Sequence, residues 1–123
     1  MKAPEDNIIA QKSFDFAVRC VNLYKHLCYK SINKEFVISK QLLRSGTSIG
    51  ANIEEALGAQ STADFLAKLS IAYKETRESI YWIKLLYKTN YLSDMEYTSL
   101  INDLEDIINI IAKIKITTEK NNS

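Results

Sequence analysis

The sequence predicts an all-α protein, a single antiparallel up-down-up-down four-helix bundle that occupies residues 1–123. Four stretches carry apolar residues at alternating spacings of three and four, which is the period of one helix face. Short polar segments join these stretches, and short connections make consecutive helices antiparallel neighbours. The composition, with 46% hydrophobic and 25% charged residues, is that of a globular chain long enough for one core. We expect no strand, no second domain and no internal repeat.

The first helix is predicted over about residues 7–30. Its exposed side carries Lys12, Arg19 and His26 at seven-residue intervals, so the three side chains follow one line along the helix. The residues expected on its buried stripe are Phe14, Ala17, Val21, Tyr24 and Cys28.

The second helix is predicted over about residues 36–57, with Gly58 as its terminating residue. Gly46 and Gly50 lie inside this helix, four residues apart. Each glycine in a helix costs about 1 kcal/mol relative to alanine. The pair therefore predicts a face on which another backbone approaches closely.

Polar residues run beside these glycines. Ser45, Ser48 and Asn52 share a line from which they could hydrogen-bond across a helix interface. Asn52 also follows the apolar stripe of Leu42 and Ile49, so we expect it to be buried. A buried amide without a partner costs roughly 1 to 3 kcal/mol. We therefore expect a hydrogen bond to Ser48 or to a group on the third helix.

Two capping pairs mark the starts of the third and fourth helices. Ser61 with Asp64, and Ser93 with Glu96, have the spacing at which side chains satisfy the exposed backbone donors of a first turn. The predicted ranges are 62–90 and 94–117. The polar tail beyond Thr117 is expected to fray.

The third helix has more aromatic area than one core can bury. Tyr73 and Tyr87 lie on its main apolar face, whereas Tyr81 and Trp82 point to other sides. Tyrosine and tryptophan are favoured at interfaces because each combines a large apolar body with a polar tip. These four residues are the predicted oligomer interface, and we expect a homo-oligomer.

Charge is distributed unevenly, although the net charge is only +1. Residues 1–44 carry +4, residues 45–110 carry −5 and the remainder carries +2. Lys12, Arg19 and Lys30 are candidate nucleic-acid contacts on the first helix, flanked by Phe16 and Tyr29. So few phosphate contacts support only weak, non-specific and salt-sensitive binding, and a solvated helix face is the competing interpretation.

The sequence does not favour a metal or catalytic site. A di-iron bundle needs Glu-x-x-His pairs, but the only histidine is His26 and Leu23 lies three positions before it. Cys20, Cys28 and His26 lack a fourth zinc ligand and a common face. The two cysteines, about 12 Å apart on one helix, are expected to be free thiols, with Cys28 in the core. We expect no cofactor, no small-molecule substrate and no enzyme activity.

The start of the chain and its apolar runs bear on the cellular compartment of the protein. No apolar run approaches the roughly 20 residues needed to cross a bilayer, and the charged start lacks the apolar stretch of a signal peptide. We expect a cytoplasmic protein without a membrane partner.

The stretch from Leu42 to Ala56, with Ser61, Asp64, Phe65 and the run from Leu69 to Glu75, resembles the bacterial 23S rRNA-intervening-sequence proteins, also labelled ribosomal proteins. The signature residues of the resemblance are Ser48, Ile49, Asn52, Ile53 and Glu55. The resemblance implies a four-helix bundle that forms pentamers. The family is similar to the accessory protein of diversity-generating retroelements, a homopentamer that binds reverse transcriptase and nucleic acid. No catalytic residues are established for the family of intervening-sequence proteins, so the resemblance implies none here.

Three functional hypotheses follow. The first is a non-enzymatic oligomeric scaffold or adaptor, a homopentamer by resemblance, with a further protein partner as an open alternative. The second is an accessory protein that binds RNA weakly through the basic side of the first helix. The third is an enzyme whose site the sequence does not reveal.

Overall fold

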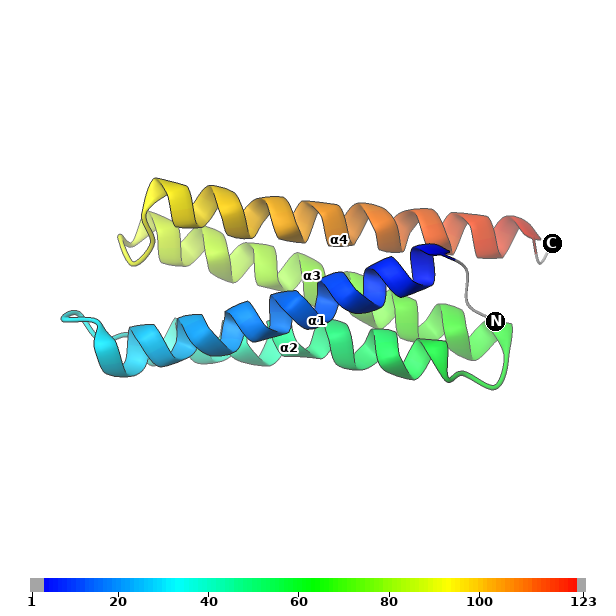
Figure 1. Cartoon of the computed structure of the whole chain (residues 1–123), viewed down its shortest axis with the longest axis horizontal. Coiled ribbons are helices and arrows are strands. Elements are labelled where there is room, and N and C mark those ends of the chain that lie inside the picture. The colour runs from blue at the N-terminus through cyan, green and yellow to red at the C-terminus, as the bar shows by residue number, and fades with distance from the viewer. Residues whose placement is uncertain (1–3, 122–123) are drawn as a thin grey trace.

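The protein is an all-α bundle of four helices in the computed structural model, which describes residues 4–121 and contains no strand within that range. The helices are α1 (Pro4–Lys25), α2 (Val37–Leu57), α3 (Thr62–Lys88) and α4 (Asp94–Asn121). A π-helical turn, η1 (His26–Lys30), continues α1. Consecutive helices run antiparallel (Figure 1). The predicted fold class is confirmed, and the predicted helix ends are correct to within three residues except at the C-terminus.

The C-terminal end of α4 differs from its prediction. The helix continues to Asn121, although the residues after Thr117 were expected to fray. Thr118 is half-buried there, so this last turn is not wholly solvent-exposed. The low intrinsic helix propensity of threonine and asparagine is overridden by a helix already formed over six preceding turns, because adding residues to an existing helix is easier than starting one.

Side chains cap the helix starts as the capping pairs predict. Ser61 Oγ accepts from the Asp64 N–H at 3.1 Å before α3. Before α4, Ser93 Oγ accepts from the Glu96 N–H at 3.1 Å, and Glu96 Oε1 accepts from the Ser93 N–H at 2.8 Å. Asn90 takes a positive φ of 70° in the turn between these helices, a conformation that asparagine tolerates better than most residues.

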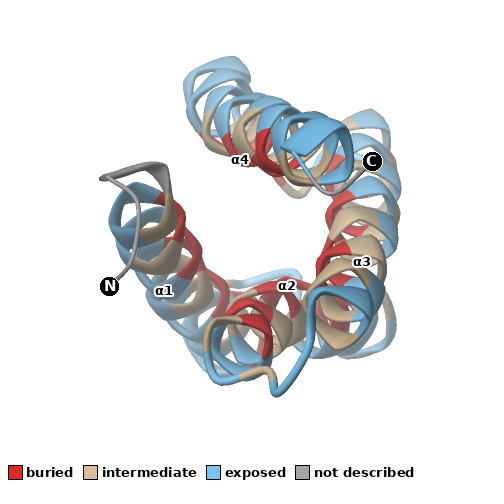
Figure 2. Ribbon diagram, turned by 90° about the vertical axis from the view of Figure 1, so that its right-hand side faces the viewer, coloured by how far each residue is buried: buried red, intermediate tan, exposed pale blue. Residues whose placement is uncertain are grey.

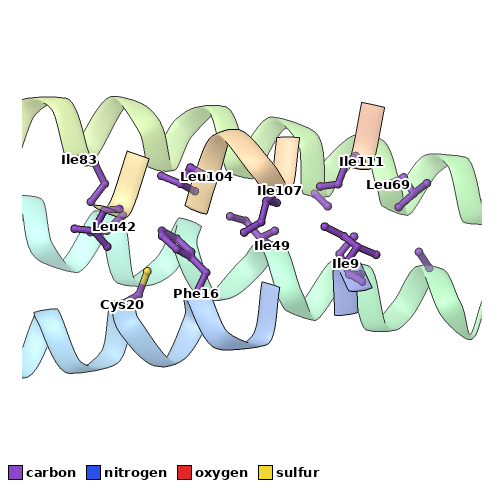
Figure 3. Packing of buried hydrophobic residues seen from close by; sticks show 14 of the residues in the cluster. Ile9, Phe16, Cys20, Leu42, Ile49, Leu69, Ile83, Leu104, Ile107 and Ile111 are labelled. Atoms are coloured by element: carbon purple, nitrogen blue, oxygen red, sulfur yellow. The ribbon is translucent and has the colours of Figure 1, made fainter. Parts of the chain in front are cut away.

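The four helices surround one apolar core. Figure 2 shows the buried residues facing inward, with α2 between α1 and α3 and with α4 on the far side of α3. The contact of α2 with α3 is the most extensive, and α1 contacts α4 much less than it contacts α2. Figure 3 shows Phe16, Leu42, Ile49, Leu104 and Ile107 along this core, and each is at most 1% exposed.

The predicted buried stripe of α1 is wrong for two residues. Phe14 is 65% exposed and Val21 is 37% exposed, while Ala17 and Tyr24 are half-buried. Cys28 is buried as expected. Among residues 6–30, those that are buried are Ile9, Ser13, Phe16, Cys20, Leu27 and Cys28. The helix has two apolar lines, and hydrophobic periodicity cannot tell which of them turns inward.

The glycines of α2 determine which of the two apolar lines of α1 is buried. A Cβ atom on Gly46 would lie 2.3 Å from Cys20 Sγ, and a Cβ on Gly50 would lie 3.3 Å from the carbonyl oxygen of Ser13. The Ser13–Cys20 side of α1 therefore sits directly against the bare backbone of α2. The predicted close approach of a second backbone is confirmed, and its partner is α1.

Candidate functional site

The five signature residues lie along α2, and two of them pack in the core. Ile49 and Ile53 are fully buried in the core. Asn52 Nδ2 donates to the carbonyl oxygen of Ser48 at 2.9 Å and to its Oγ at 3.0 Å. The predicted partner of Asn52 is thus correct, but the amide is half-buried rather than buried. Glu55 is exposed at the end of the helix.

Salt bridges and polar pairs join α2 to α3. Lys68 Nζ lies 3.0 Å from Glu55 Oε1. Near the middle of the bundle, Ser45 Oγ and Ser79 Oγ are 2.8 Å apart and both residues are fully buried. Of the predicted polar line, Ser45 therefore bonds across the helix interface, while Ser48 bonds within α2.

A charged cluster covers the outer side of the same interface. Arg44 binds the carboxylate of Glu78, which also accepts from Trp82 Nε1 at 2.9 Å. Glu75 lies deeper, with its Oε2 buried, 3.7 Å from Arg44 and without a hydrogen bond. Burial, together with the charge of Glu78, raises the pKa of Glu75 despite the nearby Arg44 and Lys74. This cluster joins α2 to α3 on the outer side of their interface.

The candidate nucleic-acid residues do not form one open basic surface. Arg19 donates to Asp103 of α4 at 2.6 Å, and Lys12 lies 3.7 Å from Asp106. Both cations are thus engaged along the line where α1 meets α4. Lys30 is exposed at the end of η1, away from this line.

The two aromatic residues expected to flank the basic line differ in their exposure to solvent. Phe16 is 1% exposed, so the expectation that it could stack on a base is wrong. Tyr29 is 66% exposed. Phe16 is buried because it belongs to the inward line of α1, which periodicity alone did not identify.

Three of the four predicted interface aromatics are half-buried within the subunit. Tyr87 stacks on Tyr97 with ring centroids 4.1 Å apart, and its hydroxyl donates to Asp94 at 2.6 Å. Lys115 Nζ lies 5.5 Å from the centre of the Tyr73 ring.

Tyr81 and Trp82 form the outward part of this set. Tyr81 is 58% exposed and meets Trp82 edge-on at 4.9 Å, and Trp82 is half-buried. Ile71 is 41% exposed on the same helix. We call Ile71, Tyr81 and Trp82 the α3 face.

Sequence reasoning missed a second apolar surface, on the outside of α1. Phe14, Val18 and Val21 are 65%, 44% and 37% exposed, and their spacing of four and three places them on one line. We call these three residues the α1 face. A groove of about 270 Å³ lies beside it, lined by Ala10, Phe14, Ala17, Thr47, Gly50, Ala51 and Glu54. The signal was present in the sequence as a second apolar line, but it was taken for the core.

The remaining chemistry of the described chain is sparse. Among residues 4–121, no three His, Cys, Asp or Glu side chains are grouped as a metal site requires. Cys20 and Cys28 are free and buried. Burial raises the pKa of the Cys20 thiol to about 12, although Arg19 opposes the shift, so this thiol is a poor nucleophile. None of the helices in this part of the chain combines the length and the apolarity needed to cross a membrane.

Comparison with known proteins identifies the family. Residues 5–113 match the family described as 23S rRNA-intervening sequence protein. A crystal structure of a protein of unknown function from the S23 ribosomal protein family of Bacteroides thetaiotaomicron is 53% identical, with a TM-score of 0.87, over 90% of this chain and 97% of that one. No curated protein matches. The signature, the bundle and these matches agree, and the chain belongs to the family of 23S rRNA-intervening sequence proteins.

Proposed function

We propose that this protein is a non-enzymatic scaffold that acts as a homo-oligomer, a ring of five identical subunits. The observation that carries the proposal is the α1 face, where three large apolar side chains of one helix remain exposed beside an apolar groove. Contiguous apolar area of this kind marks an interaction site on a protein surface. The number five comes from the family resemblance alone.

The α3 face is the proposed partner of the α1 face. Tyr81 and Trp82 offer large rings with polar tips, the residue types enriched at interfaces. A ring needs two different surfaces that meet repeatedly until the circle closes. The α1 face and the α3 face lie on different helices, as such a heterologous contact requires.

The small residues of the groove support the same arrangement. Ala10, Ala17, Gly50 and Ala51 leave room between α1 and α2 for a side chain from outside. Phe14 forms one wall of that space. An aromatic side chain of the next subunit would lose much more contact with water there than on a flat surface.

Two charge variants test the interface. Phe14→Glu and Tyr81→Glu each place a carboxylate on one face, and sedimentation equilibrium at micromolar concentration measures the mass. We expect the unchanged protein to sediment as an oligomer and each variant as a monomer. An equimolar mixture should form a heterodimer, because each variant supplies the face that the other has lost.

Met95→Glu is the matched control, since Met95 is 82% exposed and belongs to neither face. This variant should keep the oligomer mass. A stably folded monomer of the unchanged protein would refute the scaffold proposal. Dissociation by Phe14→Glu with no effect of Tyr81→Glu would replace the ring with a symmetric contact of two α1 faces.

The alternative function is weak, non-specific RNA binding through Lys12, Arg19 and Lys30. Two of these cations already bind aspartates of α4, so RNA would have to compete with Asp103 and Asp106. Retention on single-stranded RNA at rising salt concentration tests it. Charge reversal at Lys12 should then lower retention, and unchanged retention would remove this surface from consideration.

A further inference from the structure

One end of the bundle exposes four large apolar side chains within nine residues. Tyr29 is 66% exposed, Ile32 98%, Phe36 50% and Val37 75%. We call residues 29–37 the tip. Figure 1 shows this loop between η1 and α2 at the left end of the molecule, where it reaches beyond the neighbouring turn between α3 and α4.

The tip is held in this conformation by its only acidic residue. The Glu35 carboxylate accepts backbone N–H bonds from Val37 and Ile38 at 2.9 Å each and from Ser39 at 2.6 Å. The Glu35 carbonyl oxygen accepts from Ser39 Oγ at 2.8 Å and from Cys28 Sγ at 3.4 Å. The backbone N–H of Glu35 donates to the carbonyl oxygen of Leu27 at 2.9 Å.

These contacts invert the usual distribution of side chains. Glu35 is only 8% exposed, whereas Ile32, two residues after the end of η1, lies almost wholly in water. A loop that folds to hide its apolar residues would do the opposite. The tip therefore holds its apolar residues outward on a fixed base, as a surface that inserts into an apolar partner would.

The charge of residues 25–40 favours an anionic partner. Lys25, Lys30, Lys34 and Lys40 are all exposed. Within residues 4–121, none of these four ammonium groups lies within ion-pair distance of a carboxylate. Glu35 is the one acidic residue among residues 25–40, so this segment carries a net charge of +3.

We propose that the tip docks on the surface of an anionic lipid bilayer, with its apolar side chains in the headgroup and upper acyl region and its lysines at the lipid phosphates. The aliphatic side chains of the tip favour a bilayer over a single-stranded nucleic acid as the partner. Bases would stack on Tyr29 and Phe36 but would gain little from Ile32 and Val37, which enter lipid readily. The contact is peripheral, and each basic residue near an anionic membrane adds to the attraction.

Vesicle flotation of the full chain tests this docking. Phosphatidylcholine vesicles with about a third of phosphatidylglycerol should carry the protein, whereas pure phosphatidylcholine vesicles should not. Lys34→Ala should weaken binding about fivefold, the effect of one cation near an anionic surface. Ile32→Glu should abolish it.

Ile116→Glu is the matched control, because Ile116 is also exposed, at 65%, and lies near the far end of α4. This variant should bind vesicles like the unchanged protein. Circular dichroism checks that both variants remain helical.

Three results would overturn the proposal. The first is vesicle binding that does not depend on phosphatidylglycerol or on Ile32. The second is binding of single-stranded RNA that requires Tyr29 and Phe36, without vesicle binding. The third is an Ile32→Glu variant that sediments at a smaller mass than the unchanged protein, which would make the tip a contact between subunits.

Discussion

Gly46 shows how a single missing methyl group sets the spacing of two helices. Because an added Cβ would lie 2.3 Å from Cys20 Sγ and 3.3 Å from a ring carbon of Phe16, Gly46→Ala forces α1 outward or changes the Cys20 rotamer. Overpacking of this kind costs about 1 to 3 kcal/mol, more than the roughly 1 kcal/mol that alanine contributes to the helix. We expect a lower free energy of unfolding in urea.

The clash with Cys20 can be isolated by a double-mutant cycle. In a Cys20→Ala background, the nearest remaining atoms are 3.3 and 3.4 Å from the added Cβ, so Gly46→Ala should cost less there than in the unchanged protein. Gly50→Ala is a milder comparison, since its Cβ would lie 3.3 Å from the Ser13 carbonyl oxygen. Equal costs in both backgrounds would mean that Cys20 does not set the spacing.

We expect the Glu75 carboxylate to oppose folding at neutral pH. Its pKa is raised by burial and by Glu78, so the folded state disfavours the charged form above the ordinary carboxyl pKa. Glu75→Gln should therefore raise the melting temperature at pH 7. The difference should shrink as the pH falls through the raised pKa, where Glu75 itself becomes neutral.

Glu78→Gln provides the contrast, because Glu78 binds Arg44 and accepts from Trp82. Its replacement should lower the melting temperature at pH 7. A Glu75→Gln variant that is less stable than the unchanged protein at pH 7 would show that the contact with Arg44 outweighs burial.

At the scale of the element, Glu35 caps the start of α2. Burial acts to raise its pKa, but backbone hydrogen bonds from Ile38, Ser39 and Val37 outweigh burial, and the pKa of Glu35 is lowered. The carboxylate therefore contributes stability above its ordinary pKa, and this stability is lost as the pH falls through the lowered value. Glu35→Gln should cost about 1 kcal/mol at pH 7, as the loss of a helix cap does.

Thermal unfolding between pH 3 and pH 7 measures this effect. The difference between the unchanged protein and Glu35→Gln should narrow toward pH 3. Glu54→Gln, at an exposed carboxylate near the other end of α2, should leave stability nearly constant. A Glu35→Gln difference that does not depend on pH would assign the effect to side-chain shape rather than charge.

The number, type and approximate ends of the helices could be predicted because they depend on local signals. Capping at Ser61 and Ser93 is a property of four consecutive residues, and it is present in the structure. The inward face of α1 could not be predicted, because Phe14 and Phe16 are equally apolar and the choice depends on Gly46 and Gly50 of another helix.

At the scale of the whole molecule, the candidate surfaces could be predicted only in part. Of the four aromatic residues predicted at an interface, Tyr81 is exposed, and the other three are half-buried. The α1 face and the tip were missed, because their exposure depends on how distant segments pack and on the burial of Glu35. Pairing of Arg19 with Asp103 was missed for the same reason, as the two residues are 84 positions apart.

The Arg19–Asp103 pair bears on the order in which the helices pack during folding. Contacts between consecutive helices close short loops, but the Arg19–Asp103 contact must bring together the first and the last helix of the chain. Long loops are closed at a higher entropic cost, so we expect α1 and α4 to meet after the hairpins have formed. Arg19→Met should then speed unfolding in stopped-flow measurements and leave the refolding rate unchanged, because an interaction absent from the transition state affects only the rate of escape from the native state.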